Sequence, residues 1–96
     1  MPSVIKGWAD REARRLFEGK RSRVPTEIQK RSLSKLQTLD AATKLETLAG
    51  IPGNRMEVLG GDRLGQHSIR VNVQYRVCFR WESGDAYEVE VVDHHG

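Results

Sequence analysis

The spacing of apolar residues changes about halfway along the chain, and this change does most to limit the folds open to it. Between residues 10 and 48, apolar side chains recur every three or four positions, as on the buried face of a helix. From residue 55 onward they alternate with polar ones, as in strands that have one buried face. Helices followed by a run of strands predict an α+β domain, with the N-terminal helices packed on one face of a small, mainly antiparallel sheet.

The helical half carries recognisable start and stop signals. Asp10 can cap a first helix, and Gly19 in a polar segment ends it. Pro25 fits the first turn of a second helix, which has Asp40 near its end. The expected elements are an edge strand Val4–Trp8, a helix from Asp10 to about Lys20, a second helix from Pro25, and a helical turn Thr43–Leu48.

The strand half reads as a meander with short connections. Asn72–Gln74 and Glu82–Asp85 have the length and composition of tight turns, while Gly60–Gly65 is a flexible loop. Nothing in the composition divides the chain, so residues 1–96 are expected to form one domain. The four expected strands are Arg55–Leu59, Gln66–Val71, Tyr75–Trp81 and Ala86–Val92.

Strand parity predicts which side chains share a face, because successive residues point to opposite sides of a sheet. The side expected to meet the helices carries Tyr75, Val77, Phe79, Trp81, Tyr87, Val89 and Val91. The opposite side, expected to be open, carries Arg70, Arg76, Cys78, Arg80, Glu88 and Glu90. We call this second side the arginine face.

The composition is that of a small folded domain. Hydrophobic residues make up 38% of the 96 positions and charged residues 30%, which is typical of globular rather than disordered chains. The apolar runs are far shorter than the ~20 residues needed to cross a bilayer, and the N-terminus lacks the apolar stretch of a signal peptide. The single cysteine, Cys78, excludes an intramolecular disulfide. We therefore expect a cytoplasmic protein without membrane association.

The charges are unevenly distributed along the chain. The net charge is +3, with eleven Lys and Arg against six Asp and Glu in residues 1–48, and five against seven in residues 49–96. All five cations of the second half are arginines, whose planar fork suits phosphate groups. This pattern favours an anionic partner such as a nucleic acid.

Three groups of residues have the chemistry of a functional site. The arginine face can hold the phosphates of an RNA backbone, or its arginines can pair across strands with Glu88 and Glu90. The closing Asp93-His94-His95 can transfer protons or be a frayed terminus, and it has no second cluster with which to bind a metal. Glu57, beside a Gly-Gly loop, can act as a general base or be an ordinary exposed glutamate.

Cys78 has no activating base that the sequence identifies. It is interpreted as a small buried or half-buried residue.

The order and spacing of several short motifs resemble the HigB toxins of the RelE/ParE superfamily, which belong to type II toxin–antitoxin systems. The resemblance covers nearly the whole chain. Its most specific pieces are Leu36-Gln37 with Leu39-Asp40-Ala41-Ala42, Gly61-Asp62-Arg63 with Gly65, Ser68-Ile69, Tyr75-Arg76-Val77 with Phe79, and Gly84-Asp85-Ala86-Tyr87.

The resemblance implies a RelE/ParE-like fold and a ribosome-dependent mRNA endonuclease, or mRNA interferase, that needs no metal or other cofactor. The ribose 2′-OH would attack the phosphate of a message held in the ribosomal A site, leaving a 2′,3′-cyclic phosphate. It also implies a HigA-like antitoxin with a helix-turn-helix domain. The complex would repress its own operon, with operator DNA bound only through the antitoxin.

Residue by residue, the resemblance makes Arg76 the phosphate clamp. Asp93 and His95 match the first and last residues of the family's terminal Asp-Tyr-His, with His94 in place of the tyrosine. His94 and Glu57 are then the leading candidates for proton transfer, while Asp93 and His95 position or assist. The candidate RNA contacts are Arg55, Arg63, Arg70 and Arg80.

The chain departs from the family pattern at Gly60, where a lysine is common. Loss of this cation predicts weak or moderate catalysis. Two alternatives stay open. One is a non-enzymatic inhibitor of DNA gyrase on the same fold, as in ParE-like relatives. The other is a catalytically weakened toxin that acts mainly as an antitoxin-bound regulator.

Overall fold

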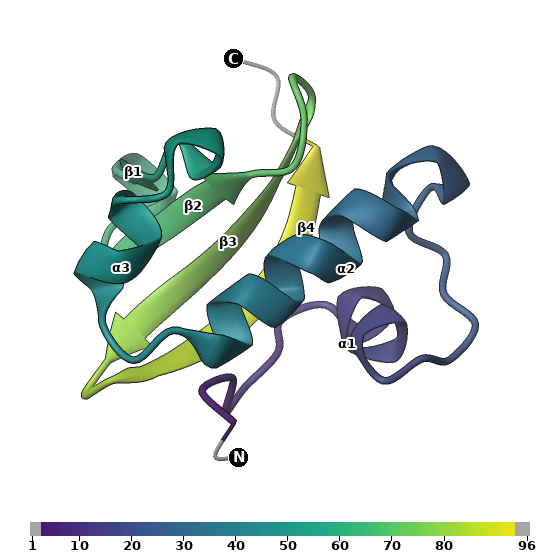
Figure 1. Ribbon diagram of the computed structural model, residues 1–96, viewed down its shortest axis with the longest axis horizontal. Helices are drawn as coiled ribbons and strands as arrows, with labels where there is room; N and C mark the ends of the chain where they lie inside the picture. The colour runs from purple at the N-terminus through teal and green to yellow at the C-terminus, as the bar shows by residue number, and fades with distance from the viewer. Residues whose placement is uncertain (1–2, 94–96) are drawn as a thin grey trace.

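The computed structural model describes residues 3–93, which form three helices and a four-stranded sheet (Figure 1). All neighbouring strands are antiparallel, and their order in the sheet follows the chain. The elements are α1 Arg11–Phe17, α2 Thr26–Ala41, α3 Leu45–Ala49, β1 Glu57–Val58, β2 Gln66–Arg70, β3 Tyr75–Glu82 and β4 Asp85–Asp93, with 3-10 turns η1 Pro52–Asn54 and η2 Gly61–Arg63. The predicted α+β class is confirmed.

Local signals explain the two ends of α1. The side chain of Asp10 accepts a hydrogen bond from the backbone N–H of Glu12 at 2.9 Å, as expected of a capping residue. The helix ends at Phe17 rather than near Lys20, because Gly19 adopts a φ of +76°, which a helix cannot include.

Among residues 3–93, no helix has the length and apolar character needed to cross a bilayer.

The predicted N-terminal edge strand extends the sheet only partly. Ile5 and Trp8 form isolated parallel bridges with Ala86 and Val89 of β4. The carboxylate of Asp40, near the end of α2, accepts hydrogen bonds from the backbone N–H groups of Val4 and Ile5, each at 3.0 Å. The segment is thus held between the edge of β4 and the end of α2.

The core lies between α2 and the sheet face predicted to meet the helices. From α2 come Ile28, Leu36 and Leu39, and from the sheet come Val77 and Phe79, none of them more than 1% exposed. Burying a side chain of this size contributes ~1.5–3 kcal/mol. Because Val77 and Phe79 both face this core, the predicted parity of β3 is confirmed at its centre.

The parity predicted for β4 is wrong at Tyr87. The register between β3 and β4 shifts between Cys78 and Arg80, and Glu88 has a φ of +53°, so a bulge adds one residue to β4. Tyr87 consequently pairs with Arg80 and lies on the arginine face, where the guanidinium stands 5.2 Å from the centre of its ring. Ala86 takes the buried position instead, with no exposed surface.

Candidate active site on the arginine face

A cavity of about 260 Å³ lies on the arginine face, opposite the helix-covered core. The loop between β1 and β2 covers this part of the face, so the expectation of an open surface is wrong here. Arg76 is 6% exposed, Cys78 2% and Ser68 not at all. The lining residues are Leu59, Gly60, Arg63, Ser68, Arg76, Cys78, Val92 and Asp93.

Arg76 is held rigidly in this cavity by neutral acceptors. Its Nε donates to Ser68 Oγ at 2.7 Å, and its Nη2 donates to the carbonyl oxygens of Arg55 at 2.6 Å and Ser68 at 3.4 Å. None of the ion pairs within residues 3–93 involves Arg76. A buried charge without a counter-charge is costly and is characteristic of binding and catalytic sites.

Asp93 borders the cavity at the end of β4. Arg76 pairs with Val92 across the β3–β4 ladder, and Asp93 pairs with Tyr75, the residue before Arg76, so the end of β4 lies beside this part of β3. The Asp93 carboxylate accepts a hydrogen bond from Gln74 Nε2 at 3.1 Å. The next two predicted site residues, His94 and His95, lie outside the described residues.

Glu57 lies on the same face but outside the cavity. It pairs with Ser68 across the β1–β2 ladder, which places it on the arginine-face side of β1, and it is exposed to solvent. It is not among the residues that line the cavity, whereas Gly60, where the resembled family commonly has lysine, is. Of the two carboxylates predicted to take part in chemistry, only Asp93 therefore borders the cavity.

Arg63 and Arg80 pair with glutamates, as one of the two sequence interpretations predicted. Arg63 faces Glu90 through Nη1 at 3.4 Å and Nη2 at 3.5 Å, and the hydrogen bonding to Glu90 raises the pKa of the guanidinium. Arg80 pairs with Glu82 and lies 3.7 Å from Glu88. These two arginines are already neutralised within the fold.

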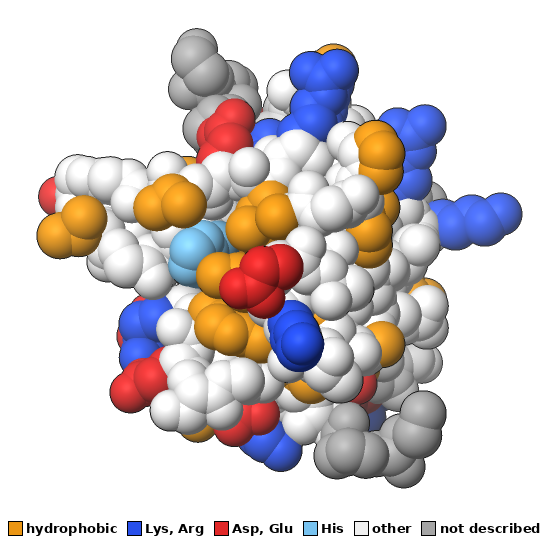
Figure 2. Space-filling model, turned by 60° about the vertical axis from the view of Figure 1, so that its left-hand side comes forward, with side chains coloured by type: hydrophobic (Ala, Val, Ile, Leu, Met, Phe, Trp, Pro, Cys, Tyr) orange, Lys and Arg blue, Asp and Glu red, His pale blue; other side chains and the backbone are white. Residues whose placement is uncertain are grey.

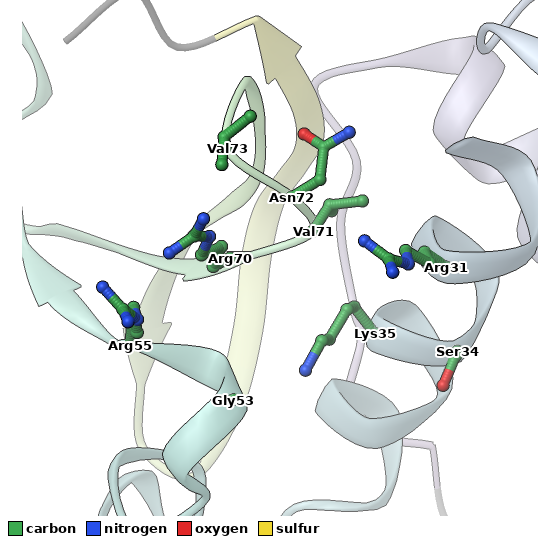
Figure 3. Close-up of a pocket in the computed structure, with 9 residues that line it drawn as sticks. All are labelled: Arg31, Ser34, Lys35, Gly53, Arg55, Arg70, Val71, Asn72 and Val73. Carbon is green, nitrogen blue, oxygen red and sulfur yellow. The ribbon is translucent and has the colours of Figure 1, made fainter. Parts of the chain in front are cut away.

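Arg55 and Arg70 lie elsewhere, although both were predicted to contact RNA together with Arg63 and Arg80. They line a separate groove of about 570 Å³ that they share with Arg31 and Lys35 of α2 (Figure 3). Sequence reasoning did not select Arg31 or Lys35 as site residues. Their i, i+4 spacing, which puts two cations on one side of α2, was the available signal.

Ser68 and Cys78 complete the cavity. Ser68, which sequence reasoning did not select, orients Arg76 through its hydroxyl group. Its parity with Arg70 on β2 was the signal that could have identified it. Cys78 is buried as predicted, and burial raises the pKa of its thiol.

Within residues 3–93, no three His, Cys, Asp or Glu side chains are grouped to hold a metal ion.

His67 belongs to the opposite side of the sheet and so stands apart from the cavity. It pairs with Phe79, whose ring centre is 5.8 Å away, and with Val58, which is 75% exposed. Figure 2 shows hydrophobic side chains gathered around a histidine on this side of the molecule. Burial lowers the pKa of His67, favouring its neutral form.

Comparisons with known proteins identify the family of this chain. Residues 6–95 match the model of the HigB-like toxin family, described as the RelE-like toxin HigB of type II toxin–antitoxin systems. Toxin HigB-1 of Vibrio cholerae is 42% identical over 71 residues, which cover 74% of this chain and 75% of the relative. Endoribonuclease HigB of Proteus vulgaris is 35% identical over 97 residues, covering 96% and 100%. The chain therefore belongs to the HigB-like family of type II toxin–antitoxin toxins.

Proposed function

We propose that this toxin, an endoribonuclease, cuts translated messenger RNA at the ribosome and binds the scissile phosphate in the cavity around Arg76. The observation that carries the proposal is the state of Arg76. The residue is 6% exposed, and its guanidinium is fixed by Ser68 and the Arg55 carbonyl and has no acidic partner within residues 3–93. Such a fixed, unneutralised cation suits the charge that develops on a phosphate under attack.

The proposed reaction needs no metal ion. The ribose 2′-OH loses its proton and its oxygen attacks the adjacent phosphorus, the bond from phosphorus to the 5′-oxygen breaks, and that oxygen takes up a proton. The products carry a 2′,3′-cyclic phosphate and a 5′-hydroxyl group. Arg76 stabilises the phosphorane, which bears more negative charge than the ground state.

The proton transfers are assigned to the end of the chain. Asp93 borders the cavity, so it is the described carboxylate that is best placed to position or accept a proton. His94 and His95 follow it directly in the sequence, and in this proposal His94 moves the protons and His95 assists. Glu57, exposed on β1, takes part only if substrate binding brings RNA across that strand.

Membership of a type II system gives this toxin an antitoxin partner. We further propose that the antitoxin is a HigA-like helix-turn-helix protein and that the complex represses its own operon through the antitoxin's contact with DNA. Action on translating ribosomes places the toxin in the cytoplasm.

The test compares Arg76→Ala with Arg80→Ala, a control that removes an arginine from the same face outside the cavity. Each variant is expressed without antitoxin, and message ends are mapped by primer extension. Arg76→Ala should lower cleavage by ~100-fold or more, the usual cost of losing a transition-state donor, while Arg80→Ala stays near wild type. Circular dichroism establishes that both variants fold.

Two results would overturn the proposal. The first is cleavage by Arg76→Ala at the wild-type rate. The second is growth arrest by the wild-type chain with DNA-damage signalling and without cuts in translated codons, which would favour the gyrase inhibitor. A folded wild-type chain that permits normal growth would instead favour the weakened, regulatory toxin.

A further inference from the structure

The groove beside α2 is lined by four cations and by no acidic residue. Arg31 and Lys35 come from α2, Arg55 from the segment before β1, and Arg70 from the end of β2. Figure 3 shows Arg31 and Lys35 on the helix at one side of the groove, and Arg55 and Arg70 at the other side. The remaining lining residues are neutral, so the groove of about 570 Å³ is strongly positive.

The four charges are left without counter-charges inside the fold. None of the ion pairs found within residues 3–93 includes any of them. Lys35 is nevertheless fixed, since its Nζ donates at 2.6 Å to Oδ1 of Asn54, a residue with no exposed surface that is itself bonded to the Leu48 carbonyl. Four cations without ion-pair partners thus line one groove, an arrangement expected for an external anion.

The groove adjoins the Arg76 cavity along two residues. Arg70 is the direct cross-strand partner of Arg76, and such partners lie about 4.5–5.5 Å apart at their Cα atoms. Arg55 borders the groove with its side chain while its carbonyl oxygen accepts a hydrogen bond from Arg76. Its backbone has φ +41° and ψ +54°, a left-handed conformation unfavourable for a residue with a Cβ.

We infer that this groove binds the sugar–phosphate backbone of the RNA strand next to the cleaved bond, with Arg31, Arg55 and Arg70 contacting consecutive phosphates and Lys35 adding a fixed point charge. This inference rests on the proposed function, because it continues the path of a strand whose scissile phosphate lies at Arg76. Arginine forks match phosphate oxygens in pairs. Val73, 83% exposed on the groove wall, offers an apolar surface to a ribose or base.

The test measures binding rather than cleavage. A fluorescently labelled single-stranded RNA, 2′-O-methylated throughout so that it cannot be cut, is titrated with the purified full-length chain at several salt concentrations. The variants are Arg31→Gln, Arg70→Gln and their combination. The matched control is Lys30→Gln, which removes an exposed cation that neighbours Arg31 on α2 but does not line the groove.

Each single groove variant should weaken RNA binding by roughly fivefold to tenfold at low salt, and Lys30→Gln by less than about twofold. The combined variant should reduce the slope of log affinity against log salt by about 1.4, since each single-strand phosphate contact contributes ~0.7. Groove variants that bind RNA as tightly as the control would overturn the inference. Groove variants that keep their RNA affinity but no longer bind the antitoxin would also overturn the inference, because the groove would then fit an acidic peptide segment.

This outcome is separable from that of the proposed function. If the groove variants bind the uncut RNA normally while Arg76→Ala still abolishes cleavage, the groove inference fails and the nuclease stands. If the groove variants lose RNA affinity while Arg76→Ala cuts like wild type, the groove is an RNA-binding surface and the assignment of Arg76 fails.

Discussion

The two ends of β3 each carry an arginine, and the two arginines have opposite environments. Arg76 is buried and bonded to neutral oxygens, whereas the Arg80 side chain is 38% exposed and pairs with Glu82 and Glu88. Both lie on the arginine face, four residues apart. Arginines on the same face of one strand can therefore be of two kinds. Arg80 is neutralised by carboxylates of the fold, whereas Arg76 is left for an external anion.

The acidic residues of β4 reinforce this division. Glu88 pairs with Arg80, and Glu90 pairs with Arg63 at the border of the cavity, so the charges on this side of Arg76 are locally balanced. The groove on the other side of Arg76 has four cations and no acid. An RNA strand leaving the cavity would therefore be attracted toward α2 and gain little from the Arg80 end.

The largest expected effect comes from making the Arg76 end resemble the Arg80 end. Val92 is the cross-strand partner of Arg76 and lines the same cavity, so Val92→Glu would supply the missing carboxylate. We expect cleavage to fall by ~100-fold relative to Val92→Gln, because the guanidinium would be neutralised before RNA binds. Quantitative mapping of cleaved message compares the two variants; equal activity would show that Arg76 is not the phosphate clamp.

A smaller loss is expected when the support of Arg76 is weakened. Ser68→Ala removes the hydroxyl that accepts from Arg76 Nε at 2.7 Å in a site without solvent exposure. Cleavage should fall by ~10-fold, and unfolding by urea should show a loss of ~1–3 kcal/mol because a buried donor is left unpaired. In the Arg76→Ala background, the same substitution should cost much less stability; an unchanged cost would mean that the bond contributes nothing.

A gain of similar size is expected from restoring a cation at Gly60. The residue lines the cavity, its φ of −123° is open to any side chain, and a Cβ there would meet no other atom within 4 Å. Gly60→Lys should raise cleavage by up to ~10-fold by adding a second charge near the phosphate, while Gly60→Gln should not. If both variants cut like wild type, loss of the family's lysine does not limit this toxin.

A modest effect is expected from releasing Arg63. Glu90→Gln removes the carboxylate that faces its guanidinium at 3.4 and 3.5 Å, although Gln66 still accepts from Arg63. RNA affinity, measured with the uncut probe, should rise by roughly twofold to threefold, as one partly exposed cation becomes available. A fall in affinity would mean that the ion pair orders the loop for RNA.

The smallest effect concerns the core side of the sheet. Burial lowers the pKa of His67, so the unfolded chain takes up a proton before the folded one as the pH falls below about 6.5. Its contribution to stability is present above that pH and is lost as the pH falls toward the folded pKa. Urea unfolding at pH 7 and pH 5 should show a smaller decrease for His67→Gln than for wild type, with unchanged cleavage.

Sequence reasoning succeeded where local signals and regular alternation decide the outcome. The capping of α1 by Asp10, the tight turns and the burial of Val77 and Phe79 all follow from such signals. The pairing of β3 with β4 next to the turn also follows, since a two-residue turn at Ser83-Gly84 fixes the register there, with Arg80 opposite Tyr87.

It failed where distant segments decide the outcome. The bulge at Glu88, which turns Tyr87 to the arginine face, occurs at a residue type with no preference for positive φ. The burial of Arg76 depends on how the loop around Arg63 folds over the sheet. The position of Arg31 and Arg70 along one groove depends on where α2 crosses the sheet, which periodicity along one helix cannot specify.

The pairing of Ile5 and Trp8 with β4 has a consequence for solubility during overproduction. A long strand edge with unsatisfied backbone groups is a template for aggregation, and β4 is the longest strand of the sheet. The N-terminal segment, anchored by Asp40, occupies that edge. Truncations or fusion tags that displace residues 4–8 should therefore produce inclusion bodies even though they leave the Arg76 cavity untouched.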